Sequence, residues 1–390
     1  MDEFELSTVN NFLLRKQHLS EETKGEDIPQ VTKDMWGLHA TNASTPYLSL
    51  FNRVINFKKE SLNRELLEKR LVKIKCVRKT VHIIPKENVA IAFSATKKLI
   101  QINSEKYYKS MGVTESEYGA TSKSILELLG NNGMNASEIK KELSTEINLS
   151  PIISYMCDLG ILVRGLSKAG WKSNTHTYYR MDEYLPDINL NEYIQEEARK
   201  RLVSHYISSF GPVTLTDISW WTGFPKTEIK KIVQVLEKDL EYVNISGLGE
   251  RIVSKNCLNQ LKNIKENNNQ QINLLPNLDP YIMGYKERER YLDKNYYNYI
   301  FDRSGNATTT IVNNGKVIGV WDIEEKPTPL IKIYIFEGHS NLIKEIEKKA
   351  KEIGNFIYEK EVKVKRYEAM TPLDKITVGS FMTPLKNMNG

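Results

Sequence analysis

Apolar residues recur every three to four positions through most of the first third of the chain, which is the period of an amphipathic helix. Together with capping residues such as Ser7 and Ser61, this spacing predicts helices at 8–18, 33–39, 62–71 and 86–99. Two short apolar runs between them predict strands at 74–77 and 80–84, with Arg78 and Lys79 in the turn.

The next segment predicts three helices followed by two strands. The helices are expected at 122–129, 136–143 and 150–159, with Gly160 just past the last helix, and the strands at 161–164 and 177–180. The two strands flank a polar tip. This order is that of a winged helix-turn-helix.

The same order returns about 85 to 90 residues later, at helices 196–209, 215–222 and 226–236 and strands 241–245 and 251–254. Thr214 and Asp217 resemble a capping box at the start of the middle helix. A repeated unit is a stronger signal than a single copy. We interpret the first segment, with its strand pair, as a third and irregular copy.

Polar residues fill most of 262–271, which we interpret as a linker or an exposed helix end, and the pattern then changes to a period of two. It predicts a hairpin of 308–312 and 316–321, a strand at 330–336, a helix at 341–354 and a last strand at 358–365. The expected fold class is α+β, with winged-helix modules at 1–118, 119–190 and 191–265 and a C-terminal β-rich α/β domain at 266–390.

Composition limits the partners and the cellular compartment that we expect for the protein. The 390 residues carry a net charge of +6, which permits a nucleic-acid partner without requiring one. Cys76, Cys157 and Cys257 are isolated, so buried reduced thiols are expected rather than disulfides or a zinc site. The acidic N-terminus is unlike a secretory signal, and no apolar run reaches the about 18 residues of a membrane span. We therefore expect a cytoplasmic protein, associated with the nucleoid when it binds DNA, without a membrane contact.

Basic residues on the predicted modules are candidates for phosphate contacts. The expected recognition helix of the last copy carries Lys226, Lys230 and Lys231, and the wing of the middle copy carries Arg164, Lys168 and Lys172. Such contacts would provide affinity without sequence readout. Winged helices also join proteins to one another, and surface lysines are ordinarily solvated, so an adaptor between proteins is the alternative.

Two aromatic stretches stand out in the sequence. Trp220 and Trp221 are expected to pack in the core. The segment LLPNLDPYIMGYKERERYLD combines Tyr285, Arg288 and Arg290 with acidic residues, and it would either line a positive channel or form a satisfied ion-pair network.

The sequence contains no nucleotide-binding loop, no HExxH and no GxSxG. The stretch WGLHAT differs from a plain core segment because His39 and Thr41 are two residues apart. In an extended segment the two side chains would face the same way and could share a water molecule. In the alternative reading His39 caps a helix end and Thr41 bonds to backbone.

Several stretches in order resemble one family. GLHATNASTPYLSLFNRV, KTVHIIPKENV, ISWWTGFPKTEIKKIV, LLPNLDPYIMGYKERERYLD and TTTIVNNGKVIGVW are similar to motifs of the AlkZ-type (YcaQ-like) winged-helix DNA glycosylases. The resemblance runs from about Leu6 to Phe336. It implies three tandem winged helices around a concave channel for double-stranded DNA, and the removal of alkylated bases, including some held in crosslinks.

The family's catalytic pair is QxQ or QxD, and by position it corresponds here to His39 and Thr41. In the family this pair is thought to position the water that attacks the sugar. We expect His39, as a neutral imidazole near its ordinary pKa, to accept a proton from this water and the hydroxyl of Thr41 to hold it, with no metal and no cofactor. Arg53, in the same stretch, is expected to contact DNA. We expect a monomeric, monofunctional glycosylase, and the rival reading is a non-catalytic DNA binder such as a regulator or damage sensor.

Overall fold

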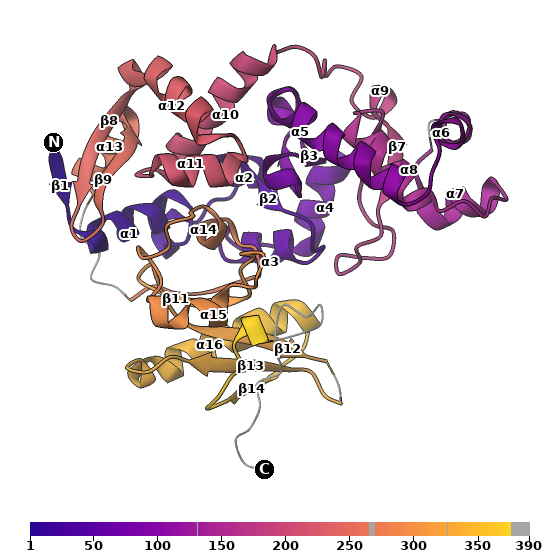
Figure 1. The fold of residues 1–390 in the computed structure, drawn as a ribbon. Coiled ribbons are helices and arrows are strands. Elements are labelled where there is room, and N and C mark those ends of the chain that lie inside the picture. Colours follow the sequence, from indigo (N-terminus) through magenta and orange to yellow (C-terminus); the bar gives the residue numbers. More distant parts are fainter. Residues whose placement is uncertain (131, 265–269, 326, 376–390) are drawn as a thin grey trace.

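The computed structural model describes residues 1–130, 132–264, 270–325 and 327–375. In this part of the chain helices surround three separate sheets, and the C-terminal sheet with its helix α16 lies at one end of the molecule (Figure 1). The central part of the expected linker, 265–269, lies outside the described residues.

The first segment contains five helices and three strands used below. They are α1 (Leu6–Lys16), α2 (Ile28–Asp34), β2 (Leu38–His39), α3 (Thr45–Phe51), α4 (Lys59–Leu67), β3 (Leu71–Lys75), β4 (Val81–Pro85) and α5 (Val89–Ser110). The helix expected at 33–39 is wrong. The chain leaves the helix after Asp34 because Trp36 and Gly37 have φ values of 63° and 148°, and it then enters strand β2.

The second segment follows the predicted order of three helices and a strand pair. Its elements are α6 (Glu115–Leu129), β5 (Met134–Asn135), α7 (Ala136–Glu142), α8 (Leu149–Asp158), β6 (Leu162–Arg164), β7 (Thr177–Arg180) and α9 (Met181–Tyr184). Asn135 caps α7 in a capping box with Glu138, which fixes the start of that helix.

The third segment repeats the order, as predicted. Its elements are α10 (Gln195–Phe210), α11 (Leu215–Thr222), α12 (Lys226–Val235), β8 (Leu240–Ile245), β9 (Gly249–Ser254) and α13 (Lys255–Lys262). The capping box of Thr214 and Asp217 is confirmed at the start of α11. Strand β1 (Asp2–Phe4), from the other end of the sequence, pairs parallel with β8. The number of winged-helix modules stays a prediction.

The strands of the first two segments form one sheet in the order β2-β4-β3-β6-β7-β5. Lys73 on β3 pairs with Arg164 on β6, so the sheet continues across the expected boundary at 118/119. This sheet supports strand β2 from one side and holds it against β4.

The C-terminal segment is a five-stranded sheet covered by one long helix. Its elements are β10 (Ile272–Leu275), α14 (Pro280–Met283), α15 (Tyr297–Ile300), β11 (Thr310–Asn313), β12 (Lys316–Glu324), β13 (Leu330–Ile335), α16 (Ile343–Tyr358) and β14 (Lys363–Arg366). The strands follow one another in sequence order, and β11 and β12 form the expected hairpin around Asn314 and Gly315.

One apolar core connects these segments. It contains Val9, Trp36, Trp221, Tyr281 and Leu373, which belong to distant parts of the sequence. Trp221 is buried as expected, whereas Trp220 is only half-buried. Among the residues described, no helix combines the length and the apolar character needed to span a bilayer. Among the described residues, Cys76, Cys157 and Cys257 form no disulfide bond.

Candidate active site

His39 and His82 face each other across two paired strands. They are directly opposite one another in the antiparallel pair β2 and β4. Opposite residues in such a pair project to the same face, and the centres of the two imidazole rings are 5.0 Å apart. Both side chains are buried, with exposed fractions of 6% and 8%.

The local backbone explains why β2 lies so close to β4. A Cβ atom on Gly37 would lie 2.9 Å from the carbonyl oxygen of Ile83 and 2.7 Å from Cγ2 of Ile84. With φ at 148°, this position also disfavours any side chain. Glycine at this point therefore lets the strand that carries His39 approach its partner.

Hydrogen bonds to the backbone set opposite tautomers on the two rings. Nδ1 of His39 lies 3.4 Å from the backbone N–H of Thr41, which can only donate, so this Nδ1 accepts and the neutral ring is protonated on Nε2. Nδ1 of His82 lies 3.1 Å from the carbonyl oxygen of Thr80, which can only accept, so this Nδ1 is protonated. His39 is left with an Nε2–H donor and His82 with an Nε2 lone pair.

Burial keeps both rings neutral near physiological pH. Desolvation lowers the pKa of His82 to about 4. The hydrogen bond to Thr80 opposes this shift, and the positive charge of Arg78 adds a smaller lowering. Desolvation also lowers the pKa of His39 well below its ordinary value, helped by His82 and Arg78. Both rings are therefore uncharged at neutral pH.

The two rings and Arg78 line a small cavity between β2, β4, α11 and α14. The cavity offers about 20 Å³ to the centre of a water molecule. A cavity of this size can hold roughly one water where polar partners are present. The rest of the lining is mostly apolar and comprises Met35, Trp36, Gly37, Val77, Phe210, Trp221, Leu278, Pro280 and Met283. Water in the cavity would find its polar partners on the imidazoles and the guanidinium.

Thr41 does not share this cavity. Strand β2 ends at His39, and the chain bends at Thr41, whose side chain is exposed. The expected arrangement required an extended segment through both residues, so the structure does not bring the two side chains to one buried position. His82 takes the place beside His39. The sequence carried one signal for it, a histidine inside the apolar strand of KTVHIIPKENV.

Five of the expected DNA-contacting residues are exposed lysines: Lys168, Lys172, Lys226, Lys230 and Lys231. Lys168 pairs with Glu138 and Lys172 with Glu325, at 3.3 and 3.0 Å. Lys226 donates to the hydroxyl of Thr216. Such surface pairs are weak, so these lysines stay available to phosphates.

Arg53 is the clearest correction among the expected DNA contacts. Its side chain has no exposed surface and forms a two-pronged ion pair with Asp279, at 2.8 and 2.7 Å. Its Nε also donates to the carbonyl oxygen of Gln17. The arginine joins α1, α3 and the segment before α14, and it cannot reach a phosphate.

The other four expected contacts are also interior residues. Tyr285 is fully buried and donates to the carbonyl oxygen of Phe210. Arg288 stacks on Phe301 at 3.3 Å and Arg290 on Tyr285 at 4.1 Å, and each is 4% exposed. Arg164 is 7% exposed within the six-stranded sheet. Most of the segment 276–293 is therefore buried, with Lys286 and Glu289 among its exposed residues, and it takes part in the ion pairs Arg53–Asp279 and Arg251–Glu287.

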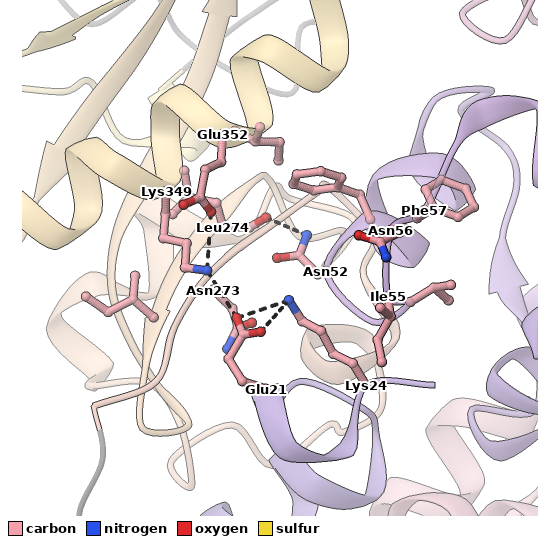
Figure 2. Close-up of a pocket in the computed structure, with 14 residues that line it drawn as sticks. Glu21, Lys24, Asn52, Ile55, Asn56, Phe57, Asn273, Leu274, Lys349 and Glu352 are labelled. Carbon is pink, nitrogen blue, oxygen red and sulfur yellow. Dashed lines mark hydrogen bonds and ion pairs between the residues drawn. The ribbon is translucent and has the colours of Figure 1, made fainter. Parts of the chain in front are cut away.

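A larger pocket lies elsewhere, where α16 and β10 meet the segments 21–24 and 51–57. It has a volume of about 360 Å³, and Figure 2 shows Glu21 between Lys24 and Lys349 among the residues that line it. Glu21 pairs with both lysines, at 3.0 and 3.1 Å. None of the expected site residues lines this pocket. In the described residues, no group of three or more His, Cys, Asp or Glu side chains is arranged to hold a metal ion.

Comparisons with known proteins agree with this fold. The family model for AlkZ-like DNA glycosylases matches residues 32–342, which include both histidines and Arg78. The solved structure of Streptomyces sahachiroi DNA glycosylase AlkZ is similar over 94% of this chain and 100% of that chain, with a TM-score of 0.75 and 19% identity, a likeness of fold. No curated protein sequence matches the chain. Because the family model covers most of its length, the chain belongs to the AlkZ-like DNA glycosylase family.

Proposed function

We propose that the protein is a DNA repair glycosylase that hydrolyses the N-glycosidic bond of N-alkylated bases in duplex DNA, including bases in crosslinks. Family membership supports glycosylase activity on DNA. The observation that carries the chemical assignment is a pair of neutral imidazoles beside a cavity large enough for one water molecule. One ring offers a hydrogen-bond donor and the other an acceptor. We propose that this cavity supplies the attacking water.

The two rings are suited to orient one water molecule. The Nε2–H of His39 donates to the water oxygen, and the water donates one of its hydrogens to the Nε2 lone pair of His82. The remaining lone pair of the oxygen is then directed out of the cavity. Thr41 has a changed role in this proposal, since its backbone N–H fixes the tautomer of His39.

The reaction balances with these groups alone. The bond between the sugar C1′ and the base nitrogen breaks, and its electron pair leaves with the base. The water oxygen forms the new bond to C1′, and its proton passes to Nε2 of His82 and then to solvent. Water is the only co-reactant, and no metal or cofactor takes part.

A weak base is sufficient for this chemistry. The sugar becomes positively charged before the water attacks, and an alkylated purine is already cationic, so it departs as a neutral molecule. A histidine with a pKa of about 4 takes up the proton late and releases it readily. An imidazole that stayed protonated would instead oppose the cationic sugar.

We further propose a monofunctional enzyme that acts as a monomer. Among the described residues no lysine lines the cavity, and a lysine amine is the group that would form a Schiff base with the sugar. The exposed lysines of the α12 face and of the loop between β6 and β7 remain our proposed contacts to the DNA backbone.

The test is release of 7-methylguanine from a methylated duplex under single-turnover conditions, with a crosslinked duplex as a second substrate. We expect release by the wild type and a decrease of about 100-fold for His82→Asn, which keeps a donor near Thr80 but lacks the Nε2 lone pair. His39→Ala should also lose activity.

His339→Gln serves as the control, because this histidine lies in the turn before α16 and outside the cavity. It should retain the wild-type rate. Duplex binding without release of any alkylated base would refute the proposal and leave a non-catalytic DNA-binding protein.

A further inference from the structure

Arg78 occupies an unusual position beside the two histidines. It lies in the turn between β3 and β4, where Arg78 and Lys79 have φ values of 54° and 58°. Two successive positive φ values favour Asn-Gly in a tight hairpin, and other residues store strain there. The turn directs the guanidinium into the lining of the cavity that contains His39 and His82.

The guanidinium lies against an aromatic ring. Cζ of Arg78 is 4.1 Å from the ring centre of Trp220, and Cζ of Arg288 is 5.5 Å from the same centre. Trp220 is half-buried, which leaves part of this assembly open to solvent. Stacking fixes the plane of an arginine fork and leaves its edge available for hydrogen bonds.

In the part of the chain that the structure describes, neither arginine has a carboxylate partner. Within the described residues, Arg78 makes no hydrogen bond and no ion pair, whereas Arg288 donates to the hydroxyl of Tyr297 and the carbonyl oxygen of Gly305. The acidic group whose charge reaches Arg78 is Asp302. Its oxygens accept from Ser304 and Asn306, so it is already committed to its own turn.

Two positive charges thus lie near the Trp220 ring, and among the described residues no carboxylate contacts either of them. Burial and the charge of Arg288 lower the pKa of Arg78 to about 10, so the group is still charged at neutral pH. An anion at the free edge of Arg78 would relieve this repulsion. Phosphate fits the donor pattern, because the planar fork can hold two of its oxygens at once.

We infer that Arg78, stacked on Trp220, binds a backbone phosphate of the DNA strand whose sugar is presented to the His39–His82 cavity. The inference rests on the proposed function and adds a phosphate ligand for Arg78, which also lines the cavity. The bound phosphate has a second consequence. It neutralises Arg78, which would otherwise repel the cationic sugar at close range.

The test measures DNA affinity rather than catalysis, so it is independent of activity. Binding of a fluorescent duplex with a tetrahydrofuran abasic site, which cannot be hydrolysed, is followed over a series of salt concentrations. Arg78→Gln should weaken binding about tenfold and reduce the slope of log affinity against log salt by about 0.9, the value for one phosphate contact. Arg78→Lys keeps the charge, and it should preserve the slope while losing part of the affinity.

Arg180→Gln is the matched control, because Arg180 already pairs with Asp182 and Glu183. It should leave the slope unchanged. A second arm adds inorganic phosphate at constant ionic strength. Competition with DNA in the wild type but not in Arg78→Gln would show that the residue also takes free phosphate, and no competition restricts it to the DNA backbone.

Identical slopes for Arg78→Gln and the wild type, with both proteins folded by circular dichroism, would overturn the inference. If the slope changes but no base is ever released, the phosphate site stands and the glycosylase proposal fails.

Discussion

Two backbone contacts decide what the imidazoles at the candidate site can do. The N–H of Thr41 and the carbonyl oxygen of Thr80 force the two rings into complementary tautomers. Either ring alone would be an ordinary buried histidine. Together they provide one donor and one acceptor on the same cavity, a function that a pair of glutamine amides could also perform.

The lowered pKa of His82 predicts the pH dependence of base release. The neutral ring is the active form, and its pKa is about 4 rather than 6.5. The single-turnover rate should therefore stay level as the pH falls through 6.5 and decrease only near pH 4. The measurement is a pH–rate profile corrected for spontaneous depurination. A loss of activity centred near pH 6.5 would be incompatible with the buried ring.

The same shift has a consequence for stability. Between pH 6.5 and 4 the unfolded chain binds a proton at this histidine and the folded chain does not, so stability falls as the pH falls. The contribution of His82 is about 3 kcal/mol over this interval. His82→Asn should show a shallower loss of stability in urea unfolding between these two pH values.

For Arg53 we predict a role in stability and not in DNA binding. Removing it in Arg53→Met leaves the carboxylate of Asp279 buried without its partner. We expect a loss of about 3 to 5 kcal/mol in the free energy of unfolding. Urea denaturation measures this loss, and Arg180→Met, at an exposed ion pair, should change stability by less than about 1 kcal/mol.

At the scale of elements, the short strand β2 determines the site. It is two residues long, and its approach to β4 depends on Gly37. Gly37→Ala should destabilise the protein by about 3 kcal/mol, because the added methyl overlaps the backbone of Ile83 at a positive φ. Thermal unfolding would show this loss together with reduced base release.

Gly119→Ala on α6 is the comparison, because Gly119 has an ordinary φ and a Cβ there meets nothing within 4 Å. We expect it to be neutral or slightly stabilising. Equal stability of both variants would mean that the close approach of β2 to β4 tolerates a side chain.

Sequence patterns predicted elements well where local signals determine them. The helix order and caps of the segments 115–180 and 195–254 follow from periodicity and from residues such as Asn135, Thr214 and Gly160. The helix expected at 33–39 failed because the turn at Trp36 and Gly37 is imposed by the neighbouring strand β4 rather than by local propensity.

The candidate site was only half visible in the sequence. His39 was found through its motif, but His82 is 43 residues away, and only the register of β2 and β4 places it opposite. Positive charge alone did not identify the DNA contacts. The guanidinium groups of four expected contacts could bind phosphate, but these residues are buried: Arg53, Arg164, Arg288 and Arg290. Exposure depends on tertiary packing, which a single sequence does not show.

At the scale of the whole molecule, the segments are joined by a shared apolar core and a shared sheet. A single core includes residues from Val9 to Leu373, and one sheet crosses the expected boundary at 118/119. The loop between β6 and β7 reaches the C-terminal segment, where Trp171 packs on Phe356 at 6.1 Å and Lys172 pairs with Glu325. The cavity between β2, β4, α11 and α14 is built from three of the four expected domains.

This continuity predicts cooperative unfolding. Far-UV circular dichroism and tryptophan fluorescence should report one coincident urea transition. Trp36 and Trp221 lie in the core that extends from Val9 to Leu373, and Trp321 lies in the core of the C-terminal segment, against which Trp171 of the loop between β6 and β7 packs. Two separated transitions would indicate that the expected domains are independent folding units.

The most direct measurement is a crystal structure of the protein with a duplex that carries a cationic aza-sugar in place of the target nucleotide, a mimic of the positively charged sugar. The account predicts one water within hydrogen-bonding distance of Nε2 of both His39 and His82, with the sugar C1′ position facing it. A dry cavity, or a sugar bound away from the two histidines, would contradict the proposed mechanism.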